Sequence, residues 1–145
     1  MKLKIITLLS LLLSFSAFSN EYQEEIDKFF NLYKTEKISQ AVDSIYSTNK
    51  YVSSIPDQVQ NVKNQLTAAK GMLGEINFIN KISDYKVGDL MVQVTYIVTY
   101  DRQPLRFEFQ FFKVNDGWRV YSFSFDDDLD DELKVLARKS ALSNS

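Results

Sequence analysis

The sequence predicts an α+β domain: N-terminal helices packed on an antiparallel sheet of about four strands, followed by a short C-terminal helix. The first observation is a hydrophobic period near 3.6 residues that changes to 2 at about Ile76. The second is that the alternating segments after this point collect their aromatic residues on one side. An antiparallel sheet with one apolar face needs a covering layer, and the amphipathic helices that precede it provide one.

The first 19 residues have the pattern of a cleavable secretory signal. Two lysines precede an apolar run from Ile5 to Leu13, and Ala17-Phe18-Ser19 supplies the small-x-small pattern of a cleavage site. An uncleaved anchor is the alternative, but the run is shorter than the roughly 20 residues that cross a bilayer. We therefore expect cleavage after Ser19, export to the periplasm or the medium, and one domain over 20–145 without a membrane span.

Composition excludes several functional classes. Removal of the signal leaves 15 basic and 19 acidic residues, a net charge of −4, which argues against a nucleic-acid or anionic-membrane partner. The chain has no cysteine, so it forms no disulfide and is not a lipid-modified lipoprotein. It has no histidine, which excludes Ser-His-Asp and Cys-His catalysis, His-ligated zinc and the usual acid/base group near neutral pH.

Three amphipathic helices are expected before the sheet. Thr35 is the predicted N-cap of the second helix. Ser54 is the predicted N-cap of the third, with Pro56 in its first turn. Gly71 and Gly74 are expected to stop that helix. The inward stripes are Tyr22, Ile26, Phe29, Phe30 and Tyr33 in the first helix, Ile38, Val42, Ile45 and Tyr46 in the second, and Val59, Val62, Leu66 and Ala69 in the third.

Four strands follow. The first, around Phe78–Val87, alternates less regularly, so its register stays open, and Gly88-Asp89 forms the turn after it. Clear alternation marks three more strands around Val92–Tyr100, Phe107–Phe111 and Tyr121–Phe125. Acidic residues at the start of the tail and basic residues at its end then match a helix dipole, which predicts the C-terminal helix.

The strand register is expected to place the aromatic residues on one face, because a one-residue slip turns every side chain to the other face. A two-residue loop at Arg102-Gln103 pairs Tyr96 with Phe109. In the next hairpin, a three-residue loop with left-handed Gly117 unites the aromatic residues, whereas a two-residue loop at Asp116-Gly117 separates them. The three-residue loop gives the pairs Phe111–Tyr121, Phe109–Phe123 and Phe107–Phe125. The apolar face then contains Val92, Val94, Tyr96, Val98, Tyr100, Leu105, Phe107, Phe109, Phe111, Tyr121, Phe123 and Phe125.

The hairpin Lys113-Val114-Asn115-Asp116-Gly117-Trp118-Arg119-Val120, placed after helices and long strands, resembles the NTF2-like (cystatin-like fold) superfamily. The resemblance covers roughly Tyr22 to Phe125. It implies an exported member of the superfamily whose curved sheet folds around the first helix into a cone. Members range from enzymes to carriers and dimerisation modules, so the fold alone does not give the function.

The predicted ligand site is the interior of this cone. Its aromatic lining favours an apolar or amphipathic small molecule, and we expect no cofactor. The residues are Tyr96, Tyr100, Phe107, Phe109, Tyr121 and Phe123. The acidic run from Asp126 to Glu132 fails as a calcium loop, because Asp131 replaces the glycine at position 6 and Ala137 the glutamate at position 12, so no metal site is predicted.

The opposite, mixed face of the sheet carries a predicted contact surface. Arg106 and Glu108 on this face are interpreted as solvated, but an apolar cluster lies near the last hairpin, where the resemblance implies dimerisation. The predicted interface, for a homodimer or another protein, is Ile97, Phe112, Val114, Trp118 and Val120.

Two functional hypotheses follow. The first is a non-enzymatic exported binding or interaction module, and if the helices fill the cone, only the contact function survives. The alternative is a small isomerase- or dehydratase-like enzyme that uses Asp84 together with Tyr96 or Tyr100 inside the cone.

Overall fold

The computed structural model describes residues 21–144, so the predicted signal at 1–19 lies outside the described residues. Four antiparallel strands form one sheet in the order β1-β2-β3-β4, which confirms the predicted α+β class. The strands are β1 (Ile76–Val87), β2 (Met91–Tyr100), β3 (Pro104–Val114) and β4 (Gly117–Asp126).

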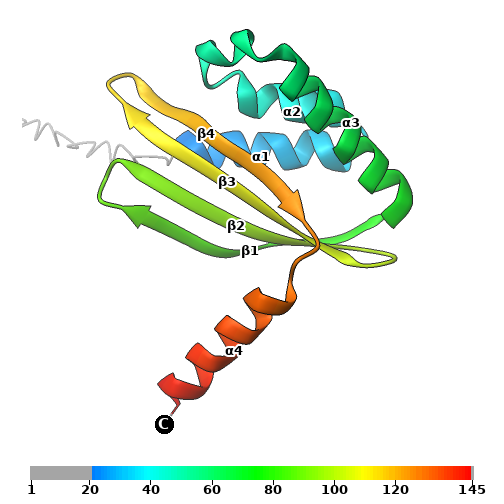
Figure 1. Cartoon of the computed structure of the whole chain (residues 1–145), viewed down its shortest axis with the longest axis vertical. Helices are drawn as coiled ribbons and strands as arrows, with labels where there is room; N and C mark the ends of the chain where they lie inside the picture. Colours follow the sequence, from blue (N-terminus) through cyan, green and yellow to red (C-terminus); the bar gives the residue numbers. More distant parts are fainter. Residues whose placement is uncertain (1–20, 145) are drawn as a thin grey trace, which may run out of the picture.

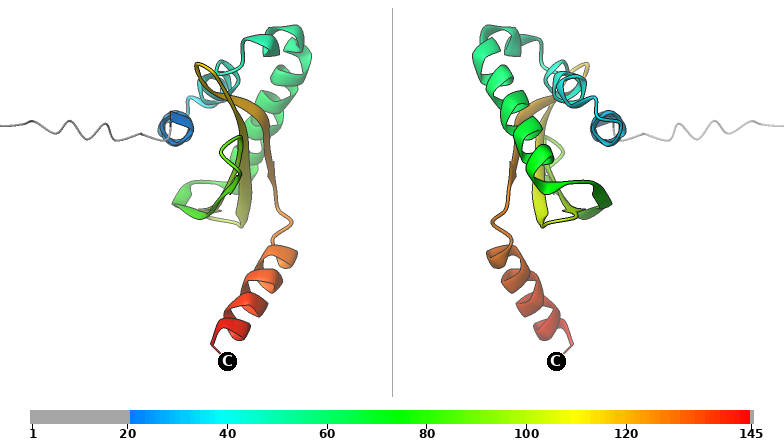
Figure 2. Two further views of the ribbon diagram at one scale, coloured as in Figure 1. Left: turned by 90° about the vertical axis from the view of Figure 1, so that its left-hand side faces the viewer. Right: turned by 90° about the vertical axis from the view of Figure 1, so that its right-hand side faces the viewer.

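The helices before the sheet are α1 (Glu21–Lys34), α2 (Ile38–Tyr46) and α3 (Pro56–Leu73), with a short 3-10 helix, η1 (Lys50–Ser54), between the last two. Figure 1 and Figure 2 show α1 and α2 on one face of the twisted sheet, which we call the inner face. Within the described part of the chain, no helix covers the opposite face, which we call the outer face. α3 packs against α2 near β4, and its C-terminal end leads into β1 (Figure 1).

The helix stripes agree with the periodicity, but the predicted caps are wrong. The Thr35 hydroxyl donates to the carbonyl oxygens of Asn31 and Leu32 at 3.0 and 3.1 Å, so it ends α1 instead of starting α2. Ser54 donates to the Tyr51 carbonyl within η1, and no side chain caps α3, which begins after Ile55. Short hydroxyl side chains satisfy whichever carbonyl is near, so their type alone does not distinguish a helix start from a helix end.

The end of α1 instead uses a left-handed residue that is not glycine. Glu36 has a φ of 64°, its N–H donates to Tyr33, and the next N–H, of Lys37, donates back to Leu32. This is the Schellman arrangement, which usually places glycine at that position. The Glu36 carboxylate lies 2.6 Å from the ammonium of Lys70, a residue only 7% exposed, so the α1 terminus is tied to α3.

The β2–β3 register differs from the prediction by two residues. Tyr96 lies opposite Phe107, and the shift keeps every side chain on its predicted face. The predicted loop at 102–103 fails because it needs a donor at position 104, and Pro104 has no N–H. The longer loop is held from outside the hairpin, since the backbone N–H groups of Asp101 and Arg102 donate to the carbonyls of Glu75 and Leu73 at 3.1 Å each.

The β3–β4 hairpin confirms two predicted pairs, Phe109–Phe123 and Phe107–Phe125. Near the turn the prediction is wrong. Val114 pairs with Gly117 around a two-residue loop, and a β-bulge leaves Tyr121 without a partner between the pairs Gln110–Ser122 and Phe111–Val120. A bulge adds one residue to a strand, so the residues before it change faces.

The edge of β4 near the bulge is bonded to the loop after α2. The Val120 N–H donates to Thr48 Oγ1 at 2.9 Å, and the Val120 carbonyl accepts from Asn49 Nδ2 at 3.0 Å. These contacts satisfy backbone groups that an edge strand otherwise presents to solvent.

The predicted C-terminal helix is present as α4 (Asp130–Ser143). It projects away from the sheet and the other helices in every view (Figure 1, Figure 2). No helix among residues 21–144 combines the length and the apolar character that crossing a bilayer requires.

Candidate functional site

The interior predicted to hold a ligand is occupied by α1. Phe107 and Phe109 are 0% exposed and Phe123 is 7% exposed. The Phe29 ring lies 6.2, 5.3 and 5.1 Å from the rings of those three residues, measured between centroids. Phe30 packs beside it, 4.8 Å from the ring of Tyr96. The aromatic lining therefore encloses helix side chains where the prediction placed a small molecule.

The three tyrosines of the predicted site have separate environments. The Tyr96 hydroxyl accepts from Gln23 Nε2 at 2.8 Å, and the Tyr100 and Tyr33 hydroxyls are 2.7 Å apart. Burial raises the pKa of both Tyr96 and Tyr100. Tyr121, at the bulge, is 67% exposed on the outside, so its predicted place in the lining is wrong.

Asp84 lies at the seam between α1 and β1. It is opposite Val94, which places it on the inner face. Its carboxylate accepts from the Tyr22 hydroxyl at 3.3 Å and pairs with the Lys81 ammonium at 3.5 Å. Burial, together with the charge of Asp84, raises the pKa of Tyr22 to about 12. Both carboxylate oxygens therefore have partners within the chain, and this cluster connects α1 to β1.

A solvent-facing hollow of about 470 Å³ lies between α2, η1 and α3. Tyr46, Val52 and Val59 line it, and Asp43 and Lys63 form an ion pair of 2.7 Å at its wall. Sequence reasoning missed this hollow, because it depends on how η1 spaces the two helices and no residue pattern marks it.

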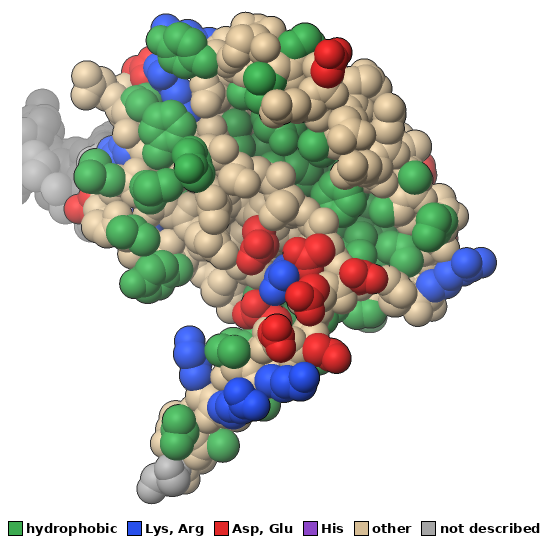
Figure 3. All heavy atoms as spheres, in the orientation of Figure 1, with side chains coloured by type: hydrophobic (Ala, Val, Ile, Leu, Met, Phe, Trp, Pro, Cys, Tyr) green, Lys and Arg blue, Asp and Glu red, His purple; other side chains and the backbone are tan. Residues whose placement is uncertain are grey.

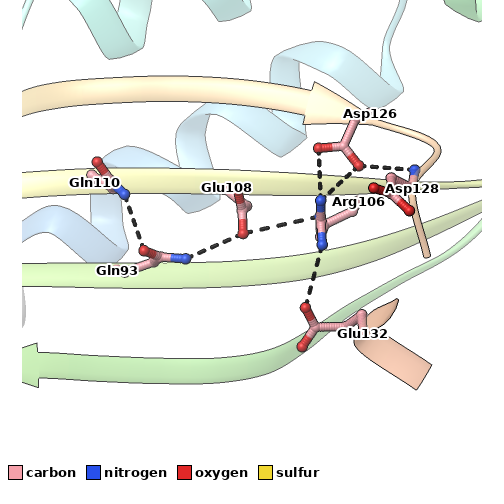
Figure 4. Close-up of polar contacts among 7 residues, drawn as sticks. All are labelled: Gln93, Arg106, Glu108, Gln110, Asp126, Asp128 and Glu132. Atoms are coloured by element: carbon pink, nitrogen blue, oxygen red, sulfur yellow. Dashed lines mark hydrogen bonds and ion pairs between the residues drawn. The ribbon is translucent and has the colours of Figure 1, made fainter. Parts of the chain in front are cut away.

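The outer face is built around a row of linked polar side chains (Figure 4). Gln110 Nε2 donates to Gln93 Oε1 at 3.0 Å, and Gln93 Nε2 donates to Glu108 Oε1 at 3.1 Å. Glu108 Oε1 then lies 4.0 Å from Arg106 Nε. These residues come from β2 and β3, so the row crosses the middle of the sheet.

Arg106 is the junction between this row and α4. Its guanidinium lies 3.0 Å from Asp126 and 3.4 Å from Glu132, and its side chain is 17% exposed. The hydrogen bond that Arg106 donates to the Asp126 carboxylate is the main cause that raises the pKa of Arg106. One guanidinium therefore connects β3, the end of β4 and the first turn of α4. The interpretation of Arg106 as a solvated residue is therefore wrong. The predicted pairing of Phe107 with Phe125 already places Arg106 opposite Asp126.

The predicted interface residues are divided between the two faces. Ile97, Phe112 and Val114 are half-buried on the outer face. Trp118 and Val120 face the helices, so their assignment to the outer face is wrong. Val120 is 2% exposed, and the Trp118 ring meets the Tyr22 ring edge-on at 5.1 Å. The physical reason is the bulge at Tyr121, which reverses the faces of the residues before it.

The apolar surface at the hairpin end of the sheet includes residues of β1 and β2 that were not predicted, and it does not include Trp118 and Val120. Val87 pairs with Met91, and Met91 pairs with Phe112, so the three form a row across β1, β2 and β3. Val87 is 60% exposed, and the neighbouring Leu90 is 67% exposed. Figure 3 shows hydrophobic side chains gathered at this end of the outer face, on the left. We define the hairpin-end patch as Val87, Leu90, Met91, Phe112 and Val114.

No group of three or more carboxylate, histidine or cysteine side chains is placed to hold a metal ion within the described part of the chain. Comparisons of the sequence with family models, and of the chain with curated proteins and solved structures, found no match. The residues and their geometry are therefore the basis for any functional assignment.

Proposed function

We propose that the protein is a non-enzymatic exported interaction module of the NTF2-like type, which acts by protein contact through the outer face of its sheet. The observation that supports this most is the contrast between the two faces. The inner face is packed against α1, whereas the outer face carries the hairpin-end patch and is not covered by any helix of residues 21–144 (Figure 1, Figure 3). A contiguous exposed apolar patch beside polar residues is typical of a protein-contact site.

The geometry of the patch favours a protein partner over a small ligand. The row of Val87, Met91 and Phe112 is presented on strands and not in a cavity, and small-molecule sites are usually concave. The polar row borders the patch through Gln93 and Gln110, the next pair after Met91 and Phe112 on this face of the ladder, and supplies the hydrogen-bonding rim that protein interfaces have.

Site-specific photocross-linking tests the contact function. A photoreactive phenylalanine analogue at position 87, in the producing cells, should give a defined cross-linked product. The same analogue at Asn64, an exposed residue of α3, is the matched control and should give none. Equal labelling at both positions, or none at position 87, would contradict the proposal.

The carrier function has a separate test. A displacement assay and native mass spectrometry of the mature protein with lipids and aromatic acids should detect no bound species, because Phe29 occupies the interior. A stoichiometric complex that Phe29→Ala strengthens would show that the interior opens to ligands, and the contact function would then be wrong.

The enzyme hypothesis rests on Asp84, which does lie on the inner face. Its hydrogen bond with Tyr22 and its ion pair with Lys81 favour a role in holding α1 to β1. An Asp84→Asn variant should lose stability without losing the cross-linked product at position 87.

Export is tested by fractionation and by the mass of the mature chain, which should begin at Asn20.

A further inference from the structure

α4 is a helix without a packing surface of its own. Leu133, Val135 and Leu136 are 57%, 47% and 38% exposed, and none of the residues of α4 is buried. It has 14 residues, and helices of this length are marginal in water unless an apolar side packs against something. α4 therefore needs a partner surface to gain ordinary helix stability.

The attachment of α4 directs it away from its own sheet. Glu132 is held by Arg106 at 3.4 Å, and the N–H of Asp128 donates to Asp126 at 3.0 Å just before the helix. Leu129 is only 9% exposed, so the start of the helix is seated on the body. From this fixed start α4 runs off the end of the sheet (Figure 1, Figure 2), and Leu133 and Leu136 stay exposed.

Charge is divided along this segment. Six of the seven residues from Asp126 to Glu132 are acidic, and the bases Lys134, Arg138 and Lys139 follow. Figure 3 shows the acidic group at the base of α4 and the basic side chains along the projecting helix. A second copy of α4 that runs in the opposite direction would therefore place its basic residues beside the acidic start of the first, and its acidic start beside the basic residues of the first.

We propose that the partner of α4 is a second copy of this chain, with the two α4 helices packed antiparallel. On one helix side the exposed Leu133 and Leu136 lie three residues apart, the i, i+3 spacing of a contact stripe, and they continue the line of Leu129, which packs on the body of its own chain. Antiparallel packing about a two-fold axis places Leu133 beside Leu136 of the second copy and Glu132 near its Lys139. Parallel packing brings the two acidic starts together, which repulsion opposes.

This contact uses a different surface from the hairpin-end patch, so it stands apart from the proposed function. A contact of two short helices is smaller than a standard interface and relies on exposed charges. We expect a weak dimer whose dissociation constant rises with salt, because ions screen exposed charge pairs.

Sedimentation analysis of the mature protein at low and high salt tests this proposal. The wild type should dimerise at low salt, and the Arg138→Glu/Lys139→Glu variant should dissociate at least about tenfold more readily, a factor that corresponds to 1.4 kcal/mol. Asp130→Lys/Asp131→Lys should also dissociate, and an equimolar mixture of the two variants should recover the dimer. The matched control is Lys28→Glu/Lys37→Glu, which makes the same change in net charge on exposed residues elsewhere and should leave dimerisation unchanged.

Helix direction is tested by engineered disulfides, which the cysteine-free chain makes simple to interpret. A mixture of Leu133→Cys and Leu136→Cys proteins should form the mixed disulfide on oxidation. A disulfide between two Ser140→Cys chains would indicate parallel helices and overturn the proposal. Circular dichroism of each variant verifies that the helices are retained, and recovery of the dimer in the charge mixture shows independently that both variants fold.

Three other results would overturn the proposal. One is a monomer at all concentrations and salts. The second is a dimer that both α4 charge variants still form but the Val87→Glu variant does not. This result would place self-association on the outer face and would agree with the proposed function. The third is binding of monomeric wild type, but not of Arg138→Glu/Lys139→Glu, to vesicles of phosphatidylcholine and phosphatidylglycerol, which would assign α4 to a lipid surface.

Discussion

The two faces of β3 consist of alternating residues of the same strand, and they differ in burial and in polarity. Phe107, Phe109 and Phe111 are fully buried against α1, whereas Glu108 and Gln110, between them, stay half-exposed in a polar row. The inner side chains are large and apolar, so packing them is the main stabilisation available to a chain without disulfides. Residues used in this way are fixed by the fold. Residues of the outer face are not needed to fill the core, so their side chains can differ without loss of the fold.

The sharpest test of this contrast compares adjacent residues of β3. Phe109→Ala should lower the free energy of unfolding by about 3–5 kcal/mol, because it removes a fully buried ring and leaves a cavity. Gln110→Ala should cost below about 1.5 kcal/mol, since it removes one neutral hydrogen bond to Gln93. Urea denaturation measures both. Equal losses would mean that the two faces are not distinguished as described.

A second test concerns the connection between α3 and β1, which joins the helices to the sheet. Gly74 has a φ of 87°, and a Cβ atom there would lie 2.9 Å from Asp101 Oδ2. Gly74→Ala should therefore cost about 1–3 kcal/mol of strain. Gly71→Ala is the control: it lies inside α3 with open space around it and should raise the unfolding midpoint slightly. If Gly74→Ala leaves the free energy of unfolding unchanged, the backbone of this connection can adjust to a side chain, and the expected strain is absent.

Arg106→Met tests how firmly the outer face is organised. Loss of the guanidinium leaves Asp126 and Glu132 facing each other without a cation, and we expect a cost of about 1–2 kcal/mol. Hydrogen exchange in α4 should increase, because its first turn loses its attachment. Arg119→Met, which breaks the 3.5 Å pair with exposed Asp116 and a contact with the exposed Tyr51 ring, should cost below about 1 kcal/mol. Unchanged exchange in α4 would count against Arg106 as the anchor.

The smallest effect concerns a hydroxyl group inside the filled interior. Burial raises the pKa of Tyr33 to about 12, from an ordinary value of 10.0. The unfolded chain loses this proton first, so the contribution of neutral Tyr33 is complete below pH 10 and is lost as the pH rises toward 12. Tyr33→Phe should cost about 1 kcal/mol at neutral pH through the lost bond to Tyr100. It should also make the alkaline decline of stability shallower, which urea denaturation at several pH values measures.

Periodicity predicted the parts of the fold that depend on burial. The stripe of Tyr22, Ile26 and Phe29 identified α1, and the alternation of Phe107, Phe109 and Phe111 identified the inner face of β3, because each pattern repeats over several residues. A two-residue error in the β2–β3 register left these faces correct for the same reason, since a shift by two preserves alternation.

Features set by single residues were not predicted. The bulge at Tyr121 depends on contacts from Thr48 and Asn49, which are about 70 residues away in the sequence, and it decided the faces of Trp118 and Val120. Whether the interior is open or filled also depends on the angle at which α1 crosses the sheet, and a stripe of residues does not encode that angle.

The position of α1 at the beginning of the described chain has a consequence for biosynthesis. Phe29 and Tyr22 emerge early from the ribosome, whereas the rings of the sheet that they pack against, from Phe107 to Phe123, emerge only after α2, α3, β1 and β2. Until then α1 can pack on α2, but its aromatic side chains have no sheet to pack against. The core therefore cannot be completed before β3 and β4 have been synthesised, and until then a nascent segment with exposed aromatic residues is available to chaperones.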